Sequence, residues 1–275
     1  MPTRSLRALL AGAALALAAA APAHAAFDAA TAAALDKALA GDHRSEQNRA
    51  RDVWRHPKET LEFFGFRQGQ TVVEVWPGGG WYTEVLAPVL NGAGSYVAAG
   101  PDKDTENGAK AVARFRQKLD SRPDLYGKVT LTEMGPQDLA IAPAGSADLV
   151  LTFRNVHNWM GQDWAPAAFK AMYDALKPGG TLGVVEHRAP DTAPQDPKAK
   201  NGYVRQDHVV KLAQEAGFKL VATSEVNANP KDTKDHPAGV WTLPPVLTLK
   251  DQDREKYLAI GESDRMTLRF VKPAS

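Results

Sequence analysis

The sequence predicts an α/β protein in which helices cover both faces of a parallel, doubly wound sheet. Apolar runs of strand length alternate with segments of helical periodicity over most of the chain. The run 147–153 is almost continuously apolar, which is typical of a strand buried on both faces of a parallel sheet. A glycine-rich turn at 77–80 joins another such run to a helical segment.

That turn belongs to segment 71–86, TVVEVWPGGGWYTEVL, around which the rest of the chain is organised. Three consecutive glycines allow a sharp turn and a close approach of a ligand, because no Cβ stands in the way. The unpaired N–H groups at the start of the following helix would face that ligand. Glu74, at the end of the strand, would accept hydrogen bonds from an amine or hydroxyl. A tight strand-to-helix connection without a ligand is the structural alternative.

Residues 1–26 have the pattern of a secretory signal. Arg4 and Arg7 precede the apolar run 8–21, and Ala25 ends a small-residue cleavage pattern. The run is too short for a comfortable membrane span, and a chain without cysteine cannot carry a lipoprotein anchor. We therefore expect export to a bacterial periplasm without a stable membrane anchor.

The remaining chain, 27–275, has about the length of one α/β domain. The formal charge of +1 less the two signal arginines gives 1 − 2 = −1, because the signal holds no acidic residue. This balance argues against a nucleic-acid or anionic-membrane partner, and we expect a small-molecule substrate. The absence of cysteine excludes disulfides, thiolate metal sites and cysteine nucleophiles. No feature of the sequence indicates a protein partner.

Helices are predicted before the central strand, within 27–68. Segment 28–39 is rich in alanine with leucines at helical spacing, which predicts a surface helix. Segment 45–64 predicts a pair of helices, the second with Pro57 in its first turn.

Strands and helices alternate after the glycine turn. The strands are predicted at 94–99, 129–132, 147–153, 181–186, 218–224 and 266–271. The helices are predicted at 108–119, 164–176 and 208–216. Turn 177–180 ends the second of these helices. Ligands of such sheets bind beyond the carboxyl ends of the strands, so residues just after each strand are the candidates for a site.

Three pieces of the sequence between residues 71 and 224 are similar to a known family. Segment 74–80, EVWPGGG, is similar to an acidic-x-Gly-x-Gly-x-Gly cofactor loop, 148–159 to a fourth strand with its loop, and 176–182, LKPGGTL, to a turn into a fifth strand. In this order they resemble the class I S-adenosylmethionine-dependent methyltransferases, in particular the small-molecule and quinone-type branch. The resemblance implies seven mostly parallel strands with the last antiparallel, and S-adenosyl-L-methionine as cofactor.

The resemblance also implies where this cofactor binds. Its methionine end would lie over the glycine turn, and its ribose would lie against an acidic residue after the second strand. The residues expected to contact it are Glu74, Trp76, Gly78, Gly79, Gly80, Tyr82, Asp102, Asp138 and Asn155.

The chain departs from the family pattern at two positions. Trp76 takes the place of the first glycine, and Gly100 takes the place of the acidic residue, with Asp102 as the nearest substitute. Asp138 would reach the adenine amine, or would be an ordinary carboxylate of a surface loop. A dinucleotide-binding fingerprint fails, because Thr83 stands where its third glycine would be.

Methyl transfer needs an aligned nucleophile, exclusion of water and, for some acceptors, a base that takes the departing proton. The candidates for this base are His157 after the fourth strand, and Glu186 and His187 after the fifth. As alternatives, the histidines would be hydrogen-bonded loop residues, and Glu186 would form an ion pair with Arg188 or Arg154.

Aromatic residues gather near the same edge of the predicted sheet. Trp76, Trp81, Tyr82 and Trp159 would line a pocket for a flat or cationic ligand, or would pack in the core. The long insertion 227–264 before the last strand would form a lid over the pocket, or would pack on the sheet as a peripheral decoration.

No spacing of histidine and glutamate indicates a metal site. His43, His56 and His236 are scattered in polar sequence and are interpreted as surface residues.

We therefore expect methyl transfer from S-adenosyl-L-methionine to an unidentified small or lipid-like acceptor. Two rival functions stay open. One is a non-catalytic binding protein that keeps the fold. The other is a hydrolase or lyase that uses His157 or His187 with a carboxylate.

Overall fold

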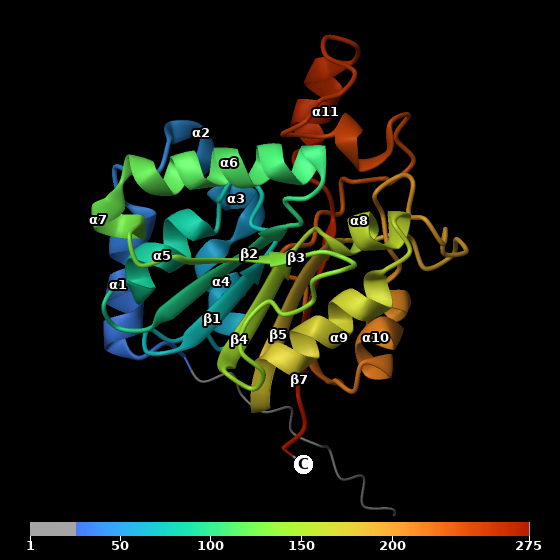
Figure 1. Ribbon diagram of the computed structural model, residues 1–275. Coiled ribbons are helices and arrows are strands. Elements are labelled where there is room, and N and C mark those ends of the chain that lie inside the picture. The colour runs from blue at the N-terminus through green and yellow to red at the C-terminus, as the bar shows by residue number, and fades with distance from the viewer. Residues whose placement is uncertain (1–25, 275) are drawn as a thin grey trace, which may run out of the picture.

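The computed structural model describes residues 26–274, so the predicted signal, apart from Ala26, lies outside the described residues. The strands are β1 (Thr71–Val75), β2 (Ser95–Pro101), β3 (Thr130–Met134), β4 (Ala147–Phe153), β5 (Leu176–His187), β6 (Lys219–Ser224) and β7 (Arg265–Val271). They form one seven-stranded sheet in the order β3-β2-β1-β4-β5-β7-β6 (Figure 1). β7 is antiparallel to both of its neighbours, and all other pairs are parallel. The predicted sheet is therefore confirmed, including its antiparallel last strand.

The helices are α1 (Ala29–Leu39), α2 (Glu46–Arg49), α3 (Asp52–Arg55), α4 (Pro57–Phe63), α5 (Thr83–Leu90), α6 (Glu106–Ser121), α7 (Pro123–Tyr126), α8 (Val156–Gly161), α9 (Ala165–Ala175), α10 (Gln206–Glu215), the 3₁₀ helix η1 (Gly239–Thr242) and α11 (Arg254–Ile260). Helices α8, α9 and α10 pack on one face of the sheet, and α1, α4, α5 and α6 pack on the other, which gives three layers (Figure 1). Within the described part of the chain, no helix combines the length and apolar character that crossing a bilayer requires.

Alternating side chains let one strand contribute to both cores. In β1, Val75 packs on the α9 side and Val72 on the α5 side, and each is at most 1% exposed. β4 is buried in the same way, with Val150 in one core and Leu149 and Leu151 in the other. Burial on both faces explains why the sequence of β4 is almost continuously apolar.

The predicted helix pair at 45–64 is three short helices, α2, α3 and α4. The break before α4 occurs at His56, whose backbone is left-handed with a φ of 39°. Pro57 follows it and has no N–H with which to continue α3.

The turn predicted at 177–180 lies within β5. Its backbone pairs with the segment that follows β7, because Gly179 N donates to the carbonyl of Lys272 and Lys272 N donates to the carbonyl of Gly180. These two bonds extend the sheet beyond the predicted start of the strand.

The insertion 227–264 is tied to the loop before α10 by a buried carboxylate. Asp232 accepts hydrogen bonds from Tyr203 OH (3.0 Å), His236 Nε2 (2.8 Å) and the backbone N–H of Asp264 (2.8 Å). The side chain of His236 is only 3% exposed, so the prediction of a surface histidine is wrong there. The insertion, with α11, lies beyond the carboxyl ends of the strands at the top of Figure 1. Its role as a lid stays a prediction.

Candidate active site

Two cavities open beyond the carboxyl ends of the central strands, where parallel sheets bind their ligands. The first cavity, of about 400 Å³, is lined by residues that follow β1, β4 and β5 and by the insertion. The second cavity, of about 640 Å³, lies between the ends of β2 and β3 and the helix α6. Trp76, Pro77, Gly78 and Asn155 line both cavities. The glycine turn therefore marks the border between two candidate ligand spaces.

Two of the three glycines of the turn face open space. A Cβ added to Gly78 or Gly79 would meet no atom within 4 Å, so a ligand can approach their backbone closely. Gly80 differs, because a Cβ there would lie 2.9 Å from Lys118 and 3.1 Å from Phe115. Gly80 lines neither cavity and lets the turn pack against α6, so its predicted contact with a cofactor is not supported.

The indole of Trp76 forms a wall between the cavities. Its backbone is left-handed with a φ of 51°, and its Nε1 donates to the carbonyl of Met134 at the end of β3 (2.9 Å). The ring packs against Trp159 and Trp164, with centroids 6.0 and 5.7 Å away. The second cavity remains open beside this wall, so the indole leaves room for a nucleoside-sized ligand.

Glu74 lies at the base of the first cavity and is 2% exposed. Its Oε2 accepts hydrogen bonds from Tyr96 OH and from Thr83 Oγ1 (3.2 Å). Burial raises the pKa of Glu74 from 4.5 to about 7, although the bonds from Tyr96 and Thr83 lower it. The carboxyl group therefore changes its charge near neutral pH.

Asn155 and Asp102 line the cavities, whereas Asp138 does not. Asn155 Nδ2 donates to the carbonyl of Val75 (2.9 Å) and so ties the end of β4 to the end of β1. Asp102 follows β2 directly and lines the second cavity. Asp138 is exposed, lines neither cavity and accepts the N–H of Ala140 (3.2 Å), as expected of a surface-loop carboxylate.

Three of the four predicted aromatic residues reach the first cavity. Trp76, Trp81 and Tyr82 line it, whereas Trp159 is fully buried in the core below α8. Tyr82 stacks on Phe153, with ring centroids 3.6 Å apart and an interplanar angle of 9°. Burial raises the pKa of Tyr82 to about 12, so its phenol is neutral at physiological pH.

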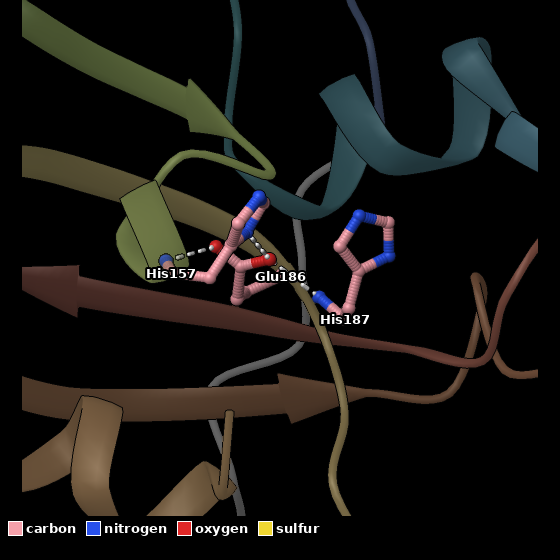
Figure 2. A group of neighbouring side chains, drawn as sticks. All are labelled: His157, Glu186 and His187. Carbon is pink, nitrogen blue, oxygen red and sulfur yellow. Dashed lines mark hydrogen bonds and ion pairs between the residues drawn. The ribbon is translucent and has the colours of Figure 1, made fainter. Parts of the chain in front are cut away.

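His157, Glu186 and His187, the three predicted bases, come together at the edge of the first cavity (Figure 2). His157 Nδ1 lies 3.0 Å from Glu186 Oε1, and its backbone N–H donates to Oε2 (3.3 Å). The N–H of His187 also donates to Oε1 (2.8 Å). Because a carboxylate only accepts, Nδ1 of His157 is the donor, and in the neutral imidazole Nε2 then carries the lone pair.

This geometry corrects the ion pair that the sequence left open for Glu186. The Arg188 guanidinium binds Asp264 (2.9 Å) and Glu225 (2.7 Å) instead. Arg154 has no bond to Glu186 either. The buried carboxylate of Glu186 instead accepts N–H groups of His157 and His187, and so fixes the orientation of the His157 ring.

His187 is held differently. Its Nδ1 lies 2.6 Å from Ser263 Oγ, and its ring centroid lies 5.4 Å from that of His157. Burial, the neighbouring His157 and the arginines 154, 265 and 55 lower the pKa of His187 well below its usual range. His187 is therefore neutral at physiological pH.

The same three residues also offer ligand atoms within 4.8 Å of one another, the geometry of a metal site. Two histidines and a carboxylate suit zinc or iron. No linear spacing reveals this group, because 29 positions separate His157 from Glu186. Both oxygens of Glu186 already accept N–H groups, however, and cationic arginines surround the site. The arrangement favours proton transfer over cation binding.

A second group of charged residues lies at the first cavity and was not predicted from the sequence. Arg51, just before α3, and Arg55, the last residue of α3, line this cavity. Glu262 and Ser263 line it from the end of the insertion. Burial raises the pKa of Glu262, but the surrounding guanidinium groups lower this pKa by more, so that it is about 2. Arg51 and Arg55 are four positions apart, which places them on one face of a helix. This spacing was the one sequence pattern that pointed to the charged group.

Comparisons with known proteins identify the fold. No protein-family model matches the sequence, and no curated protein matches it. A SAM-dependent methyltransferase from Aquifex aeolicus is 16% identical with a TM-score of 0.55, and the match covers 81% of this chain and 93% of that one. The [4+2]-cyclase SpnF is 14% identical with a TM-score of 0.57, covering 91% and 98%.

A third similar structure was solved with a ligand. Phosphoethanolamine N-methyltransferase 2 from Haemonchus contortus, in complex with S-adenosyl-L-methionine, is 14% identical with a TM-score of 0.54, covering 87% of this chain and 60% of that one. The fold of this protein is that of the class I SAM-dependent methyltransferases, as the sequence predicted. The cyclase among its neighbours has the same fold with another activity, so the function must be argued from the site.

Proposed function

We propose that this protein transfers a methyl group from S-adenosyl-L-methionine to a small-molecule acceptor, and that His157 takes the acceptor's proton. The observation that carries the proposal is the meeting of two cavities at the glycine turn, with a carboxylate-oriented histidine beside one of them. One cavity suits the nucleoside of the donor, and the other suits the acceptor.

The residues around the second cavity fit the donor. Gly78 presents bare backbone to it, and Asp102 lies where a carboxylate would accept bonds from ribose hydroxyls. The cavity volume of about 640 Å³ is within the range of small-molecule sites. When bound, the donor would supply an electrophilic methyl group on a sulfonium.

The chain's own residues would then handle the acceptor in the first cavity. The Nε2 lone pair of His157 would accept a proton from a hydroxyl or amine, while Glu186 holds the imidazole in one tautomer. Trp241 packs edge-on to His157, with centroids 6.0 Å apart, and Pro245 lines the same wall. These apolar side chains of the insertion would keep water away from the reacting atoms.

Binding of the donor tests this proposal. Gly79 and Gly69 both have ordinary φ angles, and an added Cβ meets nothing within 4 Å at either position. Gly79→Leu would place a side chain in the first cavity, next to Gly78 at the border of the second, whereas Gly69→Leu changes an exposed residue before β1. Calorimetry with S-adenosyl-L-methionine and its demethylated product should show at least about tenfold weaker binding for Gly79→Leu only, with unchanged melting temperatures.

A wild-type protein that binds neither compound at millimolar concentration would contradict methyl transfer. The second candidate, a non-catalytic binding protein with this fold, would then be favoured. The observation that favours the binding protein is Trp76, whose indole lies where the methyltransferase family has a glycine.

The proposed compartment rests on residues 1–26 alone. If the signal is cleaved as its pattern predicts, the protein recovered from a periplasmic fraction begins near Ala26. An intact Met1 on protein confined to the cytosol would contradict export.

A further inference from the structure

Three arginines share one carboxylate at the wall of the first cavity. Glu262 Oε1 accepts from Arg51 Nε (2.6 Å), and Oε2 accepts from Arg55 Nε (3.0 Å) and from a terminal nitrogen of Arg265 (2.6 Å). Glu262 is 3% exposed, so these contacts are shielded from water. Arg55 Nε also lies 3.3 Å from Oε1, so both oxygens accept two hydrogen bonds each and a further cation at this wall finds no free acceptor on Glu262.

Arg154 is the further cation. It follows β4 directly, with a left-handed φ of 62°, and its backbone N–H donates to the carbonyl of Val185 (2.7 Å). Its side chain lines the first cavity, yet the guanidinium has no hydrogen bond or ion pair with any residue that the structure describes. Burial and the neighbouring Arg265 lower the pKa of Arg154 to about 10, and at that value it is still protonated at neutral pH.

The charges around the cavity do not balance. Four guanidinium groups lie around the cavity with the carboxylates of Glu262 and Glu186, which gives 4 − 2 = +2. Glu74, with a pKa of about 7, lowers this sum to 2 − 1 = +1 when it is ionised. Like charges gathered away from water repel one another and lose hydration. The free side of this cluster is the cavity, which therefore attracts an anion.

We propose that the acceptor is a small organic anion of the carboxylate class, and that Arg154 binds its carboxylate. A planar guanidinium with free N–H groups matches a carboxylate in a bidentate pair. The remaining lining of the cavity includes the apolar side chains of Tyr82, Phe153, Trp241 and Val246, which suit an aromatic or aliphatic body. The volume of about 400 Å³ limits that body to a small molecule.

Benzoate and benzamide test this inference, because they share a shape and differ in charge. We expect the wild type to bind benzoate at least about tenfold more tightly than benzamide in a calorimetric or NMR titration. Arg154→Met should abolish this preference, and Arg154→Lys should keep part of it. Arg114→Met, which removes an exposed cation of α6 outside both cavities, should bind benzoate as the wild type does.

Stability gives a second readout. Since the Arg154 guanidinium lies among like charges and pairs with none of residues 26–274, Arg154→Met should melt at the same temperature as the wild type or higher, not lower. The inference is overturned if the wild type binds neither compound, if it binds both equally, or if Arg154→Met still prefers benzoate. It is also overturned if Arg154→Met loses affinity for S-adenosyl-L-methionine instead, since Arg154 would then bind the donor's carboxylate.

That the bound anion is the methyl acceptor rests on the proposed methyl transfer. The binding test itself does not need the methyl donor. A protein that binds benzoate through Arg154 and does not bind S-adenosyl-L-methionine would keep the anion site and lose the transfer reaction. The reverse result would keep the transfer reaction and remove the anionic acceptor.

Discussion

His157 donates twice to Glu186, once from its ring to Oε1 at 3.0 Å and once from its backbone to Oε2 at 3.3 Å. The first residues of α8 and the last residues of β5 are thereby joined through one carboxylate that is fully buried. Ring and backbone are bound to the same group, so the imidazole cannot rotate freely. Its Nε2 stays available to the first cavity.

Replacing Glu186 should allow the His157 imidazole to adopt both of its neutral tautomers. Glu186→Gln offers both an acceptor and a donor to Nδ1, so both neutral tautomers fit, whereas the carboxylate fits only Nδ1–H. ¹⁵N NMR of the imidazole should show one tautomer in the wild type and a mixture in the variant. Glu225→Gln, which removes an exposed partner of Arg188, is the control and should resemble the wild type. Identical tautomer populations in Glu186→Gln would show that Glu186 does not orient the ring.

The buried carboxyl of Glu74 should make stability fall as pH rises. Burial raises its pKa from 4.5 to about 7, so between these values the unfolded chain has lost a proton that the folded protein keeps. The free energy of unfolding should therefore decrease by up to about 3 kcal/mol between pH 4.5 and 7.

Glu74→Gln cannot ionise and should lack this decrease, while its amide oxygen still accepts from Tyr96 and Thr83. Urea unfolding of both proteins at pH 5 and pH 8 measures the difference. Parallel pH profiles would mean that Glu74 ionises in the folded protein as it does in the unfolded chain.

Removing the charge of Glu262 should destabilise the protein strongly. Glu262→Gln leaves Arg51, Arg55 and Arg265 without their shared anion, and breaking such a buried pair costs about 3–5 kcal/mol. Glu255→Gln, on the exposed surface of α11, should change the free energy of unfolding by less than about 0.5 kcal/mol. Equal urea midpoints for the two variants would contradict this account.

The same carboxylate predicts acid sensitivity. Burial raises the pKa of Glu262, but Arg265, Arg55 and Arg51 hold it at about 2, below the ordinary 4.5. Its stabilising contribution is therefore fully present above pH 4.5 and is lost as the pH falls through about 2. The stability difference between wild type and Glu262→Gln should shrink over this window.

Trp76 should report on ligands in either cavity, because it is the one tryptophan lining both. Trp76→Phe keeps a ring against Trp159 and loses the hydrogen bond to Met134, at a cost of about 1 kcal/mol. If donor binding changes the protein fluorescence, most of that change should disappear in Trp76→Phe while calorimetry still detects binding. An unchanged fluorescence response would place the donor away from the indole.

Much of the site was predictable because the ends of parallel strands meet at one edge. Asn155 and His157 follow β4, and Glu186 and His187 close β5, so the topology alone brings them together. The prediction of Asp138 as a cofactor contact and of His236 as a surface residue had no such support. Each depended on how a loop packs, which no local pattern in the sequence describes.

The sequence by itself determined the sheet, the glycine turn and the order of the strand ends. Apolar alternation and the backbone freedom of glycine are local properties, so they can be read residue by residue. Only the tertiary structure decided that Arg51 meets Glu262 across 211 positions and that the Arg154 guanidinium has no hydrogen bond or ion pair among the described residues. The physical reason is that burial and charge balance belong to the assembled molecule, because they depend on which distant segments exclude water together.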